Sequence, residues 1–197
     1  MYEYKSHNIM AIIVLHEIYG LNNFIEDVCA EFHGQGFDVF CPDMLRRDNF
    51  SYAETHDAYE YFVSNVGFDV YKEIESLIKH LALNYEKIFI IGFSIGATIA
   101  WRCCENVKCN GIICCYGSRI RDYLFLQPFC PTLLLFAEQD SFNVDNIVGE
   151  LRKKSNVEIF KLEALHGFMD KYAEWYNSKQ TQISNLYIHD FIKRNIQ

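Results

Sequence analysis

The sequence has few prolines, a shortage of basic residues and no long apolar run. No apolar stretch approaches the ~20 residues that a membrane-spanning helix needs, and no basic segment followed by an apolar one opens the chain. We therefore expect a cytoplasmic location and no membrane partner. Lys and Arg total 18 against 26 for Asp and Glu, a net charge of −8, and no basic run occurs. This balance argues against nucleic acid as a partner.

Linker-like and repeated segments are also missing. Only 3 of the 197 residues are proline, and no low-complexity stretch or internal repeat interrupts the chain. A length near 200 residues is typical of one domain, and half of the residues are hydrophobic, enough for a full core. We expect residues 1–197 to form a single domain.

The cysteines lack metal-site spacing although the chain has 8 of them. No Cys-x-x-Cys pair occurs, and the adjacent pairs at residues 103–104 and 114–115 do not match zinc ligands. The cysteines are interpreted as small buried apolar residues. We expect neither a metal nor an organic cofactor.

Short apolar runs alternate with segments of helical periodicity. The spacing predicts helices around residues 24–32, 70–81, 147–151 and 183–191. Nearly continuous runs of this kind are typical of strands buried on both faces of a parallel sheet. The apolar runs lie at residues 11–15, 37–41, 88–91, 112–115, 133–137 and 157–160. The pattern predicts an α/β protein with a mostly parallel, doubly wound sheet of about six to seven strands flanked by helices.

One connection is longer than a crossover requires. Residues 44–67 are rich in aromatic side chains and contain two arginines. The segment could form a small wall or a lid over a site at the sheet edge, or simply an extra surface helix.

The pentapeptide Gly-Phe-Ser-Ile-Gly at residues 92–96 follows an apolar strand directly and precedes a helix-compatible segment. A strand, a sharp turn and a helix around Gly-x-Ser-x-Gly are typical of a nucleophile elbow. Ser94 is the predicted nucleophile, and the amide of Ile95 is predicted to stabilise an oxyanion. A structural Gly-Ser turn is the alternative.

A serine nucleophile needs a base and an acid, which on such a fold follow the last two strands. His166 follows the apolar run near residue 160 and is the predicted base. Asp140 follows the preceding run and is the predicted acid, with Glu138 as a rival. The loop after residues 11–15 should supply the second oxyanion donor, for which the Ile18 amide is the candidate.

Several sequence blocks in this order resemble the dienelactone hydrolase family of α/β-hydrolases. They are His-Glu-Ile-Tyr-Gly-Leu-Asn at 16–22, Gly-Phe-Asp-Val at 36–39, Cys-Pro-Asp at 41–43, the pentapeptide at 92–96, Asp140, and His-Gly-Phe at 166–168. The resemblance implies an α/β-hydrolase fold and a Ser94–Asp140–His166 triad, with the Ile18 and Ile95 amides as the oxyanion hole. It also marks Glu17, which in members with a cysteine nucleophile contacts the resting thiol. Beside a serine, Glu17 is expected to contact the nucleophile or to shape the pocket.

The sequence therefore predicts a serine hydrolase that cleaves a small carboxylic ester or lactone through an acyl-enzyme. A thioesterase or amide hydrolase with the same triad, and a non-catalytic binding protein of this fold, are the alternatives. No arginine follows His166 closely, so an uncharged substrate is expected. Aromatic residues after strand ends are expected to line the pocket, although core packing would leave the same pattern, and a homodimer is a further expectation. These aromatic residues are Tyr19, Tyr116, Phe142 and Phe168.

Overall fold

The apolar runs become the strands of one twisted sheet in this computed structural model. Among residues 2–6 and 8–196, which the structure describes, seven strands are ordered β1-β3-β2-β4-β5-β6-β7. β1 pairs antiparallel with β3, and every other neighbouring pair is parallel. The strands are β1 (Tyr2–Tyr4), β2 (Met10–Leu15), β3 (Asp38–Cys41), β4 (Lys87–Phe93), β5 (Gly111–Cys115), β6 (Thr132–Gln139) and β7 (Val157–Leu165). The predicted α/β sheet of about six to seven strands is confirmed.

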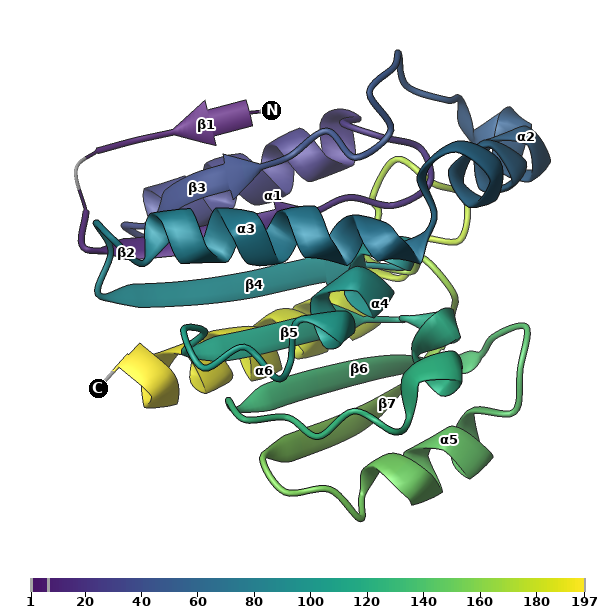
Figure 1. Cartoon of the computed structure of the whole chain (residues 1–197). Coiled ribbons are helices and arrows are strands. Elements are labelled where there is room, and N and C mark those ends of the chain that lie inside the picture. The colour runs from purple at the N-terminus through teal and green to yellow at the C-terminus, as the bar shows by residue number, and fades with distance from the viewer. Residues whose placement is uncertain (1, 7, 197) are drawn as a thin grey trace.

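Helices cover both faces of the sheet, as Figure 1 shows. α1 (Asn23–Gly34) and α6 (Ser178–Ile196) lie on one face. α3 (Tyr71–Leu81), α4 (Ile95–Arg102) and α5 (Val144–Leu151) lie on the other. The predicted helices correspond to α1, α3, α5 and α6.

Alternate side chains of each central strand enter different cores. On β2, Ile12 and Val14 pack with α1 and α6, whereas Ile13 and Leu15 pack beneath α3 and α4. This alternation explains the nearly unbroken apolar runs, because both faces of each strand are removed from water.

Short helices fill two of the connections. Four of them lie between β3 and α3, where the sequence indicated an insertion: η1 (Tyr52–Glu54), α2 (Thr55–Tyr61), η2 (Phe62–Val66) and η3 (Phe68–Val70). η4 (Ser118–Tyr123) connects β5 to β6. Both connections begin at the carboxyl ends of strands, where ligands of doubly wound sheets bind.

The sequence analysis did not predict β1. Within the described part of the chain, its Tyr-Glu-Tyr segment pairs with β3 alone, and it is partly exposed. An edge strand that is partly exposed needs no continuous apolar run, and apolar runs were the pattern that predicted the central strands.

All eight cysteines are buried with free thiols, in agreement with their interpretation as small apolar residues. No helix in the described part of the chain is both long and apolar enough to span a membrane.

Candidate active site

Ser94 occupies a sharp turn between β4 and α4. Its backbone has φ 53° and ψ −112°, an unusual conformation for a residue with a side chain. A Cβ on Gly92 would lie 2.2 Å from the carbonyl oxygen of Gly96. A Cβ on Gly96 would lie 2.3 Å from the carbonyl oxygen of Leu15 on β2. Both glycines of the pentapeptide are therefore required by close backbone approaches, and strain at the turn exposes the serine hydroxyl.

Ser94, His166 and Asp140 form a continuous hydrogen-bonded series, although they come from three different strand ends. Ser94 Oγ lies 2.9 Å from His166 Nε2. His166 Nδ1 lies 2.7 Å from Asp140 Oδ2. Since an ionised carboxylate only accepts hydrogen bonds, Nδ1 carries the proton and Nε2 presents its lone pair to the serine. The arrangement can therefore transfer a proton from Ser94 to His166.

Asp140 is suited to remain ionised in this position. Its side chain is only 2% exposed. Burial raises its pKa, but the hydrogen bond and charge of His166, together with donors from Ser141 and Ser118, outweigh burial and hold the pKa below its usual value. A carboxylate at Nδ1 orients the imidazole and stabilises the imidazolium that proton transfer creates.

The rival acid, Glu138, does not enter the site. It lies within β6, its side chain is 46% exposed, and its carboxylate is 3.8 Å from the Lys161 ammonium. A register shift between Ala137 and Gln139 interrupts the pairing of β6 with β7 just before Asp140.

The loop after β2 is held by a buried histidine. Met44 donates its amide proton to His16 Nε2 at 2.9 Å, so His16 Nδ1 carries a proton and donates to the Glu17 carbonyl at 2.7 Å. Burial lowers the pKa of His16, which keeps this neutral tautomer. The loop presents Ile18 to the same cavity as Ile95. Because Ile95 is the first residue of α4, its amide has no acceptor within the helix.

Glu17 is a buried carboxyl at the edge of the site. It is 3% exposed, and its Oε1 has no hydrogen-bond partner among the described residues. Burial raises its pKa to about 7, the nearby His166 opposes this shift, and Asp170 adds to it. Glu17 can therefore change its charge close to neutral pH.

The proposed reactive groups open onto a cavity of about 710 Å³. Glu17 and Tyr19, two of the residues that the sequence analysis singled out, line it. A volume of this size suits a small-molecule substrate.

Two predicted pocket residues lie elsewhere. Tyr116 and Phe168 are fully buried, and neither belongs to the cavity wall. The Tyr116 ring packs against the His166 ring at a centroid distance of 5.2 Å and against Phe168 at 5.5 Å. Tyr116 has a positive φ of 45°, so the chain turns at the end of β5 and its ring enters the core beside α1 and α6. Tyr116 therefore packs against the His166 ring from the core side, and Phe168 packs against Tyr116.

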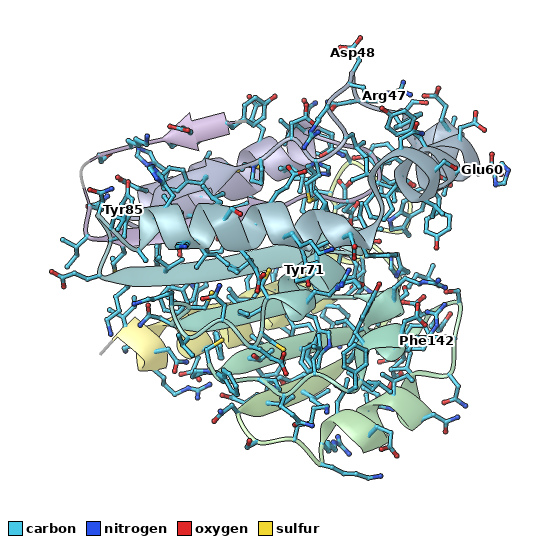
Figure 2. The ribbon with its side chains drawn as sticks, in the orientation of Figure 1. Arg47, Asp48, Glu60, Tyr71, Tyr85 and Phe142 are labelled. Carbon is cyan, nitrogen blue, oxygen red and sulfur yellow. The ribbon has the colours of Figure 1, made fainter. Side chains whose placement is uncertain are left out.

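Phe142 also lies outside the cavity wall. Its ring, labelled in Figure 2, packs 6.4 Å from the ring of Phe136. The guanidinium of Arg121 lies 5.0 Å from the Phe142 ring.

Arginines reach the cavity from η4, a source that the sequence analysis missed. Arg119 and Arg121 both line it. Their position after the apolar run at residues 112–115, at the end of a predicted strand, was the available signal. Their presence removes the reason for expecting an uncharged substrate.

Residues 44–67 form a wall of the cavity through Thr55, His56 and Tyr59. The Phe50 amide donates to the Tyr19 carbonyl at 3.1 Å, and the hydroxyls of Tyr19 and Thr55 are 2.9 Å apart. Figure 2 shows the charged side chains of Asp48 and Glu60 pointing outward from this segment.

A comparison with protein-family models identifies the family of this chain. The family model described as "Dienelactone hydrolase family" matches residues 1–196. The chain belongs to the dienelactone hydrolase family. It is therefore a carboxylic ester hydrolase with the α/β-hydrolase fold.

The chain is similar to a protein of Bacillus subtilis and to two solved structures of other hydrolases. The Bacillus subtilis protein YczH, described as uncharacterized, is 37% identical over 171 residues, with 84% of each chain covered. The crystal structure of the dienelactone hydrolase-like promiscuous phosphotriesterase P91 from metagenomic libraries has a TM-score of 0.75 at 16% identity, covering 97% of this chain and 88% of that one. Est1E from Butyrivibrio proteoclasticus, solved with ferulic acid bound, has a TM-score of 0.71 at 12% identity, covering 97% and 91%. Because the sequence identities are only 16% and 12%, these two structures show that the fold is shared and do not bear on the substrate.

Proposed function

We propose that this protein hydrolyses a small carboxylic ester or lactone through a covalent acyl-enzyme on Ser94. The observation that carries the proposal is the hydrogen-bonded series from Ser94 Oγ through His166 to Asp140, with distances of 2.9 and 2.7 Å, at the wall of the cavity. A serine hydroxyl is a weak nucleophile at its ordinary pKa and becomes reactive when an adjacent base accepts its proton.

In the first half of the reaction, Ser94 Oγ attacks the carbonyl carbon and its proton passes to His166 Nε2. The carbonyl electron pair moves to oxygen, and the amides of Ile18 and Ile95 would donate hydrogen bonds to this oxyanion. Donors fixed in place before the reaction stabilise the transition state strongly, because they need no reorganisation. The intermediate then collapses, the bond to the leaving oxygen breaks, and that oxygen takes the proton from Nε2.

In the second half, water replaces the leaving group. His166 removes a proton from the water as it attacks the acyl carbon, and later returns a proton to Ser94 Oγ as the acid departs. Asp140 retains its negative charge throughout and stabilises the imidazolium in both halves.

The test is hydrolysis of p-nitrophenyl acetate and butyrate by the wild type and by Ser94→Ala. We expect the variant to lose at least about 10⁴-fold in kcat, as for other hydrolases of this type. Ser76→Ala is the matched control, since Ser76 is exposed on α3 and its hydroxyl donates only to the Lys72 carbonyl at 2.9 Å among the described contacts. A fluorophosphonate probe should add its mass to the peptide that contains Ser94 and to no other serine peptide. Full activity in Ser94→Ala would overturn the proposed nucleophile.

A further inference from the structure

Ser118, at the start of η4, lies in the cavity wall beside the acid and the base. Its hydroxyl oxygen is 3.0 Å from Asp140 Oδ1, 3.1 Å from Oδ2 and 3.2 Å from His166 Nδ1. In the described part of the chain, all three hydrogen-bond partners of this hydroxyl belong to the proposed triad. The sequence analysis assigned Ser118 no role.

The direction of these hydrogen bonds follows from the chemistry of the partners. An ionised carboxylate only accepts, so the Ser118 hydroxyl donates its proton to Asp140. Its lone pairs then face the proton on His166 Nδ1, whose shorter hydrogen bond, at 2.7 Å, goes to Asp140. The hydroxyl therefore touches both partners of the bond that orients the imidazole.

Asp140 needs such a donor because its carboxylate is buried. Oδ1 accepts from the Ser141 amide at 2.6 Å and from the Ser141 hydroxyl at 3.0 Å. Oδ2 accepts from His166, and the single hydroxyl proton of Ser118 lies between the two oxygens, with the Ser118 oxygen 3.0 Å from Oδ1 and 3.1 Å from Oδ2. Without Ser118, Oδ2 would keep the imidazole as its one donor among the described residues, and the carboxylate could rotate toward Ser141.

The backbone of Ser118 is itself held in place. Arg121 donates from Nη1 to the Ser118 carbonyl at 2.5 Å. Glycine at position 117 suits the close approach of η4 to α4, because a Cβ there would lie 3.0 Å from Ala97 of α4, besides 2.6 Å from Ile120 of η4 itself. The turn at Tyr116 and the bond from Arg121 together aim the hydroxyl at Asp140.

We propose that Ser118 is a positioning residue of this hydrolase: its hydroxyl holds the Asp140 carboxylate in line with His166 Nδ1, and Arg121 holds the backbone that carries it. The inference rests on the proposed role of Ser94, His166 and Asp140. It concerns a residue that contacts the acid and the base but not the acyl carbon.

The test compares Ser118→Ala with Ser118→Thr, which keeps the hydroxyl, and with the exposed control Ser76→Ala. For Ser118→Ala we expect kcat with p-nitrophenyl acetate to fall roughly ten- to hundredfold, the effect of losing a hydrogen bond to a charged group. KM should stay within about twofold, because the hydroxyl orients the base and not the substrate. Ser118→Thr should recover most of kcat.

A spectroscopic measurement separates positioning from a general loss of structure. The downfield proton resonance of the His166 Nδ1–H···Asp140 hydrogen bond should shift or broaden in Ser118→Ala and stay in place in Ser76→Ala. If Ser118→Ala does not fold, Ser118→Cys, which preserves size with a much weaker donor, takes its place and should show the same loss of kcat.

Failure of the Ser118 inference can be distinguished from failure of the proposed function. If Ser94→Ala is inactive but Ser118→Ala keeps the wild-type kcat and the wild-type resonance, the Ser118 inference is wrong and the triad stands. An equal loss of kcat in Ser118→Ala and Ser118→Thr would also overturn the inference, because the hydroxyl would then not be the cause. Activity in Ser94→Ala would instead remove the proposed function itself.

Discussion

The hydroxyl of Tyr52 lies 2.5 Å from Asp170 Oδ2, joining two residues that are 118 positions apart in the chain. Tyr52 belongs to the wall formed by residues 44–67, and Asp170 follows His166 by four positions in the loop after β7. Asp170 is fully buried and also accepts from the Tyr172 amide at 2.9 Å. This contact connects the wall of the cavity to the loop that carries the proposed base.

Tyr52→Phe should therefore destabilise the protein. Burial raises the pKa of Asp170, so this carboxyl depends on its donors, and losing one leaves a buried acceptor without its partner. We expect the free energy of unfolding, measured with urea, to fall by about 1–3 kcal/mol. Tyr187→Phe is the control, because that ring stacks on Phe160 in the layer of α6. Equal stability of the two variants would contradict a structural role for the contact.

The second prediction concerns Gly96, where α4 passes over the end of β2. A Cβ there would meet the carbonyl oxygens of Leu15 at 2.3 Å and of His16 at 2.7 Å, and backbone atoms cannot move aside as a side chain can. Gly96→Ala should push α4 away from the loop that carries Ile18. We expect a loss of about 1–3 kcal/mol or more in unfolding free energy, and a drop in kcat because the two proposed oxyanion donors separate.

Gly149→Ala is the matched control for this substitution. Gly149 lies within α5, and a Cβ there would have no neighbour within 4 Å. Alanine should stabilise the helix by about 0.5–1 kcal/mol and leave kcat unchanged. The interpretation of the Gly96 contact would be wrong if the two variants behaved alike.

The third prediction follows from the buried carboxyl of Glu17. Burial raises its folded-state pKa from 4.5 to about 7. Below the lower value, both the folded and the unfolded chain hold the proton. Between pH 4.5 and about pH 7, the unfolded chain has released the proton while the folded chain still holds it, so the free energy of unfolding decreases as the pH rises. Above about pH 7 both states are ionised, and the free energy of unfolding decreases no further.

Glu17→Gln has no proton to release, so its stability relative to the wild type should increase between about pH 5 and pH 8, by up to ~3 kcal/mol. Urea unfolding at a series of pH values measures the difference. Glu174→Gln, at an exposed position, should follow the wild type throughout. If the difference in unfolding free energy between Glu17→Gln and the wild type did not change with pH, Glu17 would not have a raised pKa in the folded protein.

Local patterns in the sequence predicted most of the fold and the members of the proposed triad. The apolar runs marked the central strands because both faces of those strands are buried. The two glycines around Ser94 marked the elbow because the turn excludes any Cβ. The order of Asp140 and His166 after the last two strands followed from the parallel sheet, which brings strand ends to one edge.

Side-chain direction at those strand ends was decided only by the tertiary structure. The sequence named Asp140 as the acid with Glu138 as a rival, and in the structure Asp140 contacts His166 whereas Glu138 faces Lys161, with a break in the β6–β7 register just before Asp140. The turn at Tyr116 directs an apparent pocket residue into the core. Spacing along a chain predicts where a strand ends, but the direction of the next side chain depends on a backbone turn and on packing between distant segments.

The same reason explains the residues that sequence reasoning missed. Ser118 and Arg121 carry no motif, and they reach the site because η4 folds back over α4 at Gly117. The sequence by itself determined the sheet, the elbow and the chemical types that meet at one edge. Only the folded chain determined which hydroxyls, carboxyls and guanidinium groups face one another there, because those contacts join segments far apart in sequence.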